Sequence, residues 1–301
     1  MAALAEEALS YQPPRAHAPR PVRLVLSFAR RKPVAFLSAV VLAVICLMVL
    51  LAPLLATHDP NRQDLSARLA DPSSEHILGG DELGRDVYSR LLYGGRISLG
   101  AGLGATAIGV AAGVLLGLIS GYAAGKVDMV LQRIMDAVMA LPPLILLMVL
   151  ATTLDQNFRN VIFAIAIFVT PGAARVVRGA VLSIKEMAYV EAARSLGASP
   201  ARVAMRHILP NTFAPVIIIG SITVGSVIII EAALGFLGLS VRLPQASWGN
   251  MLNQGAQQYM EQAPLMAVVP GIAIGITVFA INLFGDGLRD VLDPRLRGKG
   301  R

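Results

Sequence analysis

Long apolar runs constrain the fold of this chain more than any other feature of its sequence. A helix needs about 20 consecutive apolar residues to cross the hydrocarbon core of a bilayer. Six stretches approach that length, at 34–56, 97–123, 134–153, 158–179, 213–235 and 264–285. Only 15% of all residues are charged, whereas soluble domains contain about 25%. The sequence therefore predicts an all-α polytopic membrane protein with six transmembrane helices.

The positions of the basic residues predict the orientation of these spans. An even number of spans places both termini on the same side of the membrane. Four segments lie on that side and hold most of the 26 Lys and Arg residues, namely 1–33, 124–133, 175–206 and 289–301. Basic residues are enriched in cytoplasmic loops, so both termini are expected in the cytoplasm. Because these residues flank apolar spans and form no basic domain, nucleic acid is not an expected partner.

The spans and the segments between them divide the chain into five parts. Residues 1–33 are rich in Pro and Arg and predict a flexible cytoplasmic arm, and 34–56 form the first transmembrane helix. An external cap segment is expected at 57–96, which holds seven acidic residues and five Arg. Residues 97–288 form a core of five transmembrane helices, and 289–301 form a cytoplasmic tail. Membrane lipid is therefore expected to surround most of the chain.

Small residues recur along the second span at every fourth position. They are Gly109, Gly113, Gly117, Gly121 and Gly125, preceded in the same register by Ala101 and Ala105. In lipid, a face of small residues lets two helix backbones approach closely, which is a main source of helix association. This face is expected to pack against another helix. The sequence leaves open whether that helix belongs to this chain or to a second subunit.

Two acidic residues lie inside predicted spans. Asp136 is near the start of the third span and Glu231 near the end of the fifth. Ionisable groups within a membrane are costly and are often functional, so both are candidates for residues that line a substrate path. The alternative is structural, because either side chain could reach the headgroup region or a neighbouring Arg.

Three proline positions are expected to interrupt spans. Pro142-Pro143 lies in the third span, Pro171-Gly172 in the fourth and Pro270-Gly271 in the sixth. Each proline removes a backbone donor, which membrane helices tolerate where protein surrounds the freed carbonyl group. These positions are interpreted as kinks, either at a gate or in helices that simply bend.

The sequence lacks the common signatures of metal, nucleotide and hydrolase sites. Its histidines, His17, His58, His76 and His207, are scattered and form no H-E-x-x-H motif, so no metal site is expected. The segment 121–127 resembles a phosphate-binding loop but has one residue too few between its glycines, and Val127 stands where Ser or Thr must reach Mg²⁺. No G-x-S-x-G motif is present. We therefore expect neither an enzyme nor a bound cofactor.

A polar segment at 185–211 separates the fourth and fifth spans. Residues 188–196 predict a short helix that Gly197 ends, because glycine readily adopts positive φ. Ser199 and Pro200 then predict the N-cap and first residue of a second helix. Two short helices on one side of a membrane suit the docking of another protein. The alternative is an amphipathic loop that lies on the headgroups.

This segment resembles the EAA loop of ABC-transporter permeases. The matching residues are Glu191, Ala192, Ala193, Gly197, Leu209 and Pro210. The resemblance implies that they form the ATPase-coupling loop, which sits in a cleft of the ATP-binding subunit. The chain departs from the pattern at His207, where the family generally has Ile.

Further motifs resemble those of the second permease of dipeptide, oligopeptide and nickel importers. They are Gly80-Asp81-Glu82-Leu83-Gly84-Arg85-Asp86, Tyr93-Gly94-Gly95-Arg96-Ile97-Ser98-Leu99, Gly235-Phe236-Leu237-Gly238-Leu239, Ser247-Trp248-Gly249-Asn250-Met251-Leu252, Asn282-Leu283-Phe284-Gly285-Asp286-Gly287-Leu288-Arg289-Asp290 and Leu292-Asp293-Pro294. Together they extend over residues 57–294. Their number and order make the resemblance specific for the family, although not for the cargo.

The resemblance implies a permease subunit of a type I ABC importer in the bacterial inner membrane. Its partners would be a homologous second permease, two cytoplasmic ATP-binding subunits that use ATP and Mg²⁺, and an external solute-binding protein. Peptides are the expected cargo, with nickel, glutathione and opines as alternatives within the family. The rival from another class is a secondary transporter or channel, which would need charged groups near the bilayer midplane and repeated halves.

Overall fold

The computed structural model describes residues 28–30 and 32–292. The predicted arm at 1–33 and the predicted tail at 289–301 lie mostly outside the described residues. Within the described part of the chain, regular structure is helical, apart from one isolated bridge between Gly80 and Asp86. The predicted all-α fold is therefore confirmed.

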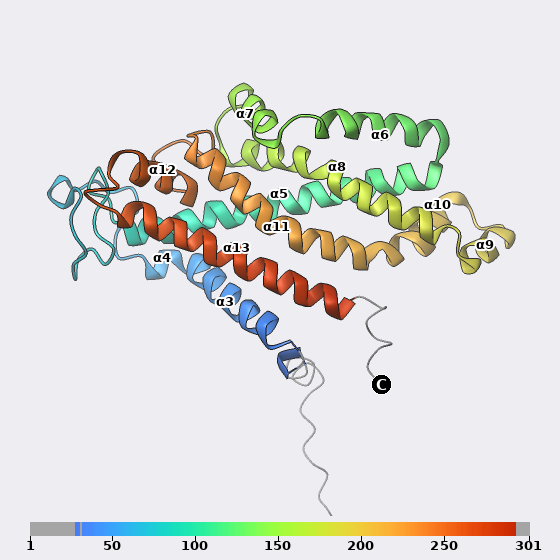
Figure 1. Cartoon of the computed structure of the whole chain (residues 1–301), viewed down its shortest axis with the longest axis horizontal. Helices are drawn as coiled ribbons and strands as arrows, with labels where there is room; N and C mark the ends of the chain where they lie inside the picture. Colours follow the sequence, from blue (N-terminus) through green and yellow to red (C-terminus); the bar gives the residue numbers. More distant parts are fainter. Residues whose placement is uncertain (1–27, 31, 293–301) are drawn as a thin grey trace, which may run out of the picture.

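Long apolar helices run side by side through most of the molecule (Figure 1). They are α3 (Pro33–Leu50), α5 (Val87–Ala123), α8 (Phe158–Ile184), α11 (Phe213–Phe236) and α13 (Leu265–Leu292), with the short α4 (Ala52–Leu55) directly after α3. In the described residues, five helical segments are long and apolar enough to cross a membrane. These correspond to five of the six predicted spans.

The third predicted span, at 134–153, is interrupted at Pro142-Pro143, as the sequence predicts. The chain forms α6 (Gly125–Met139) and α7 (Pro143–Thr153), and the two axes are bent by 89° at a short break. Pro143 occupies the start of α7. A residue before proline is driven to extended geometry, and Pro142 has ψ of 134°. The number of spans is six only if this bent pair counts as one.

The second span begins earlier than predicted, at Val87 instead of residue 97. The side chain of Asp86 caps this helix by accepting a hydrogen bond of 2.8 Å from the backbone N–H of Ser89. Such caps satisfy donors that have no partner inside the helix. The first turns of the helix contain polar residues, including Arg90 and Arg96, so they do not belong to the apolar run from which the span was predicted. The predicted cap segment at 57–96 therefore ends at Asp86.

One helix was not predicted. α12 (Trp248–Gln258) begins at Ser247, whose hydroxyl oxygen accepts a hydrogen bond of 3.3 Å from the backbone N–H of Asn250. The indole N–H of Trp248 donates to the Leu91 carbonyl at 2.9 Å, so α12 is fastened to the start of α5. The segment is amphipathic and lacks a long apolar run, which explains why a hydropathy pattern misses it.

α8 and α13 continue through Pro171 and Pro270, so the predicted kinks at these residues do not divide either helix. Proline in a helix costs one backbone hydrogen bond. Both prolines are buried, and packing against neighbouring helices keeps a membrane helix intact around such a loss. Only the Pro142-Pro143 position breaks its span.

The glycine stripe of α5 packs against α8 of the same chain. A Cβ atom at Gly113 would lie 2.5 Å from the Cβ of Ala173, and one at Gly117 would lie 2.5 Å from the Ala174 carbonyl oxygen. A Cβ atom at Gly109 would lie 2.7 Å from the Val169 Cβ, and one at Gly121 would lie 2.9 Å from the Val181 Cβ, both on α8. Gly125 differs, since a Cβ atom there would meet nothing within 4 Å and the residue has a φ of +58° at the first position of α6. The stripe thus serves packing within the chain.

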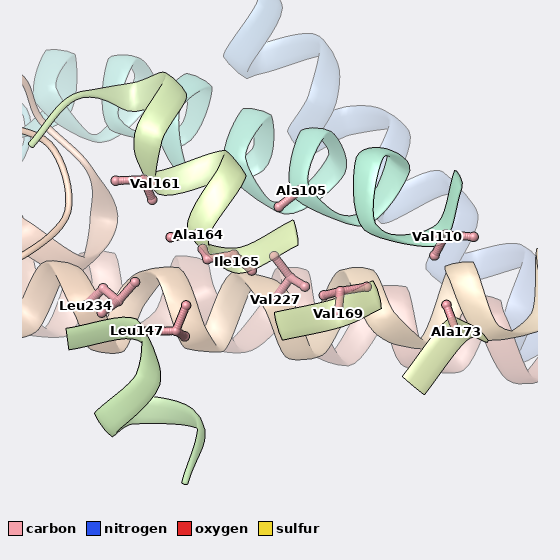
Figure 2. Packing of buried hydrophobic residues seen from close by; sticks show 10 residues of the cluster. All are labelled: Ala105, Val110, Leu147, Val161, Ala164, Ile165, Val169, Ala173, Val227 and Leu234. Atoms are coloured by element: carbon pink, nitrogen blue, oxygen red, sulfur yellow. The ribbon is translucent and has the colours of Figure 1, made fainter. Parts of the chain in front are cut away.

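Figure 2 shows the buried apolar cluster that this close approach creates. Ala105 and Val110 come from α5, Ile165 and Val169 from α8, and further side chains from α7 and α11 complete the cluster. The cluster joins α5, α7, the first half of α8 and the last half of α11. The loop between the end of α8 and the start of α11, at the other end of these helices, is the candidate functional site.

Candidate docking loop and buried polar groups

The polar loop between α8 and α11 lies at one end of the helix bundle. It contains α9 (Ala188–Ser195), α10 (Pro200–Val203), a π-helical turn at Ala204–Ile208 and a 3₁₀ turn at Leu209–Thr212. Figure 1 shows α9 and α10 at the far right, at the opposite end from α12 and the loops of segment 57–86. We call residues 185–211 the docking loop.

Gly197 ends α9 as the sequence predicts, with a φ of +80°. The N–H of Gly197 donates to the Arg194 carbonyl at 2.9 Å, and the N–H of Ala198 donates to the Ala193 carbonyl at 3.0 Å. This pair of bonds is the Schellman arrangement of a helix C-terminus. Two backbone bonds and one conformation available to glycine therefore set the angle at which the chain leaves α9.

The start of α10 also follows the prediction. The Ser199 hydroxyl oxygen accepts a hydrogen bond of 3.4 Å from the backbone N–H of Arg202, and Pro200 occupies the first helical position. Proline is favoured there because its fixed φ suits a helix and its missing N–H would have no partner anyway. Leu196, Gly197 and Ala198 complete the end of α9 and Ser199 caps α10, so the two caps together define the geometry of the docking loop.

One side of the docking loop is anchored in the bundle. Val190, Val203 and Ile208 are fully buried against the ends of α5 and α8, including Val181. Burying each aliphatic side chain contributes about 1.5–3 kcal/mol. Ile208 provides the apolar anchor beside His207, the residue that departs from the resemblance.

The other side of the docking loop is exposed. Glu191, Ala192 and Arg194 are accessible, and Leu196 has 89% of its surface exposed at the tip of the loop. Of the remaining predicted residues, Ala193 and Leu209 are half-buried, while Gly197 and Pro210 are exposed. The loop therefore brings all six predicted residues into one structural unit.

A salt bridge that the sequence analysis did not identify supports the base of the docking loop. Arg178 of α8 binds Asp128 of α6 through two contacts of 2.6 Å, and the Ser120 hydroxyl also donates to Asp128. Lys185 donates to the Gly121 carbonyl at 3.2 Å. Bidentate Arg–carboxylate pairs determine the relative orientation of the two side chains in addition to their electrostatic attraction. The only sequence signal for this pairing was that Asp128 precedes the third predicted span and Arg178, of opposite charge, lies at the end of the fourth.

Asp136 lies on α6, where its carboxylate pairs with Arg175 of α8. Arg133 is within 3.8 Å of the same carboxylate, and the side chain of Asp136 is 44% exposed. Burying an isolated charge in a membrane has a high free-energy cost, which is why such residues are often functional. That cost is small for an acidic side chain that is partly exposed and paired with a cation. The geometry favours the structural interpretation of this residue, as a link between α6 and α8.

Glu231 lies on α11 and is completely buried. Its Oε1 atom accepts a hydrogen bond of 2.8 Å from the Ser240 hydroxyl, while Oε2 has no hydrogen-bond partner. Among the described residues, no Lys, Arg or His is paired with this carboxyl group. The side chain connects α11 to the loop before α12 and reaches no open space in this conformation. Asp136 and Glu231 thus occupy separate places, and the fold does not bring them together.

The segment before α5 is held by a second set of buried charges. Arg85 is 1% exposed and donates to Asp81 and to Glu82, each at 2.6 Å. The guanidinium group of Arg90 lies 3.3 Å from Asp81. Burial, followed by the neighbouring Asp81 charge, raises the pKa of Glu82. This cluster makes the segment a compact structure at the end opposite the docking loop.

Five apolar spans, a bent helix pair and a docking loop between two spans define the membrane subunit of a type I ABC importer. The same fold is found in the MetNI methionine ABC transporter in an inward-facing conformation, with a TM-score of 0.53 and 21% identity. The match covers 69% of this chain and 94% of that one. Because the identity is low, this likeness shows the fold alone.

The family follows from sequence comparison. Residues 113–298 match the family of binding-protein-dependent transport system inner membrane components, and residues 21–72 match the N-terminal transmembrane domain of oligopeptide transport permease C. This chain belongs to the family of binding-protein-dependent transport system inner membrane components. The predicted class is confirmed, and the ABC class is favoured over a secondary transporter or channel.

Curated relatives match most of the chain. It is 41% identical over 267 residues to the probable D,D-dipeptide transport system permease protein DdpC of Escherichia coli K12, with 89% of each chain covered. It is 44% identical over 270 residues to the glutathione transport system permease protein GsiD of Shigella flexneri serotype 5b, again with 89% of each covered. The protein is thus a multi-pass inner-membrane permease.

The environment of Glu231 leads to a prediction that separates its two possible roles. Glu231→Gln keeps the side-chain volume and an oxygen that accepts from Ser240, so stability and transport are expected to remain close to wild type. Glu231→Ala leaves the buried Ser240 hydroxyl unpaired and is expected to cost about 1–3 kcal/mol. Thermal unfolding in detergent and uptake in vesicles measure both effects. Loss of uptake in the Gln variant at unchanged stability would show that the carboxyl group itself takes part in transport.

Proposed function

We propose that this chain is a transmembrane subunit of an ATP-driven importer that moves peptides across the bacterial inner membrane. The observation that carries the proposal is the docking loop, whose two capped helices are anchored on one side and exposed on the other. The docking loop can transmit the motion of an ATPase to the membrane helices only if the loop itself is rigid. The Schellman ending at Gly197 and the cap at Ser199 provide that rigidity.

The docking loop is proposed to sit on a cytoplasmic ATP-binding subunit, with Glu191, Ala192, Ala193, Gly197, Leu209 and Pro210 as its coupling residues. Glu191 offers a charge to the partner and Leu196 an apolar contact. ATP and Mg²⁺ are bound and used by two such subunits and not by this chain. In this arrangement the docking-loop end faces the cytoplasm, as the six basic residues at 175–206 favour. Both termini lie on that side, while α12 and segment 57–86 lie outside.

A homologous second permease is proposed to complete the transport path. An open apolar hollow of about 500 Å³ lies along α7, α11, α12 and α13, and its lining includes Leu144, Phe236 and Ile274. One wall of a path has this form when a second subunit supplies the other. ATP-driven closure of the ATPases would move both docking loops and alternately open the shared path to each side. An external solute-binding protein would deliver the cargo.

Peptides are the cargo that the comparisons support. The two relatives described above carry D,D-dipeptide and glutathione in their names, and glutathione is itself a tripeptide. The cargo class is therefore proposed as short peptides, including modified ones. Nickel and opines have no comparable support among these relatives.

Reconstitution with the partner subunits tests this function. The complex would be placed in proteoliposomes with the solute-binding protein, and uptake of a labelled dipeptide and of labelled glutathione would be measured. Uptake is expected to require both ATP and the binding protein, and unlabelled peptide in excess should compete. Uptake driven by an ion gradient without ATP would contradict the ABC mechanism. ATPase activity that no peptide stimulates would contradict the cargo.

A further inference from the structure

Segment 57–86 brings together three side chains that the sequence analysis treated as unrelated. His58, His76 and Asp86 each offer a ligand atom, and these atoms all lie within 4.8 Å of one another. The two imidazole rings are stacked, with centroids 4.7 Å apart and an interplanar angle of 24°. The Nδ1 atom of His76 is 3.0 Å from Oδ1 of Asp86. Spacing along the chain gives no sign of this cluster, because the two histidines are 18 positions apart.

The side chains are held in place by hydrogen bonds to their neighbours. Oδ2 of Asp86 accepts from the backbone N–H of Ser89 at 2.8 Å and from the Thr57 hydroxyl at 3.1 Å, which leaves Oδ1 directed at His76. Nδ1 of His58 is 3.1 Å from the Thr57 hydroxyl, and the backbone N–H of His58 donates to the Ser89 hydroxyl at 3.1 Å. Ligands with fixed orientations bind a metal more tightly than mobile ones, since less freedom is lost on binding.

The chemistry of the cluster suits a transition metal. Two neutral imidazoles and one carboxylate are typical ligands of Zn²⁺, with a water completing the tetrahedron. Adjacent ligand atoms in a tetrahedral zinc site lie about 3.3 Å apart when each bond is about 2.0–2.1 Å. The separation of 3.0 Å between His76 Nδ1 and Asp86 Oδ1 is close to that value. Small side-chain movements would bring His58 to the same centre.

The surroundings also favour a cation. The cluster lines a cavity of about 60 Å³, which Asp64, Glu75 and Arg62 also line. Three carboxylates and one guanidinium give this cavity a net negative charge when the histidines are neutral. Asp86 and His76 are buried, whereas His58 is half-exposed and leaves a route for an ion to enter.

We propose that His58, His76 and Asp86 form a binding site for a divalent transition cation, with Zn²⁺ as its representative. The bound ion fastens the chain after α4, which carries His58, and the loop at His76 to the N-terminus of α5 at Asp86. It therefore stabilises the cap of the bundle at the end opposite the docking loop. The site is independent of the peptide cargo and of the ATPase contact.

Zinc titration of the purified, chelator-treated full chain in detergent tests the site. Competition with a chromophoric zinc indicator measures affinity and stoichiometry, and thermal unfolding measures stabilisation. We expect one equivalent bound and an unfolding midpoint that rises with zinc concentration. His58→Ala and Asp86→Asn are each expected to weaken binding by about tenfold or more. His207→Ala, at the other end of the bundle, is the matched control and should bind zinc as the wild type does.

The variants were chosen so that a folding defect cannot be mistaken for a lost ligand. His58 is half-exposed, and Asn at position 86 still offers an oxygen for the helix cap. Both variants should therefore unfold at wild-type temperature without metal and lose only the zinc-dependent rise. Equal zinc affinity in the wild type and His58→Ala would overturn the proposal. The absence of any zinc-dependent rise in the wild type would overturn it as well.

Discussion

Replacing Gly117 by leucine is expected to prevent the chain from accumulating as a folded protein. A Cβ atom at this position would lie 2.5 Å from the Ala174 carbonyl oxygen, 2.8 Å from the Val177 Cβ and 3.0 Å from the Arg178 backbone nitrogen. Two of these three atoms are backbone, so no side-chain rotation can relieve the contact. Overpacking that neighbours can absorb costs about 1–3 kcal/mol, and here α5 and α8 must separate along their length.

The measurement is the yield of monodisperse protein in detergent together with its unfolding midpoint. Gly117→Ala should still fold but unfold at a lower temperature, because it adds the clashing Cβ atom without the rest of a leucine side chain. Gly179→Leu is the matched control, since it lies on α8 where a Cβ atom meets nothing within 4 Å, and leucine favours helix more than glycine does. A Gly117→Leu protein as stable as the Gly179→Leu control would refute close α5–α8 packing as the basis of the fold.

Gly197→Val is expected to abolish uptake while the helical bundle remains folded. Gly197 has a φ of +80°, and nothing lies within 4 Å of the position of a Cβ atom. The effect is therefore conformational. Holding a residue other than glycine in the left-handed backbone region destabilises it by about 1–2 kcal/mol, and a β-branched side chain increases this cost. Relief of that strain breaks the two backbone bonds that end α9 and changes its angle to α10. The docking loop would then no longer fit the proposed ATPase cleft, so ATP hydrolysis would proceed without transport.

ATP hydrolysis and peptide uptake, measured in the same proteoliposomes, check this prediction. Gly197→Asn is the matched control at the same position, because asparagine tolerates positive φ better than other non-glycine residues. It should retain much of the uptake that the valine variant loses. Wild-type uptake in Gly197→Val would be incompatible with a rigid docking loop as the coupling element. Loss of the folded bundle in that variant would show instead that Gly197 has a role in folding.

Several local features were predictable because they depend on neighbouring residues. The stop of α9 at Gly197 and the start of α10 at Ser199 and Pro200 follow from backbone geometry within a few positions. The apolar runs were recognisable for a similar reason, since a membrane helix must satisfy its own backbone hydrogen bonds. The break at Pro142-Pro143 was predictable as well, because proline disrupts helical hydrogen bonding, whereas the size of the change in direction there was not.

Features that depend on distant residues were not predictable. The salt bridge between Asp128 and Arg178 joins residues that are 50 positions apart. The indole N–H of Trp248 donates to the Leu91 carbonyl, 157 positions away. This bond fastens α12, a helix that contains no long apolar run and is therefore missed by a hydropathy pattern. The same limitation applied to His58 and His76, which were interpreted as scattered until the fold stacked their rings.

The sequence by itself determined the class of protein, the apolar segments, the docking-loop residues and the family. These properties are encoded in composition, in local spacing and in short motifs. Only the tertiary structure decided that the glycine stripe meets α8 of the same chain, that Glu231 is buried beside Ser240, and that Asp86 at the start of α5 lines a cavity together with His58 and His76. The physical reason is that helices in lipid associate through close packing and polar contacts, and these contacts exist only once the helices lie side by side.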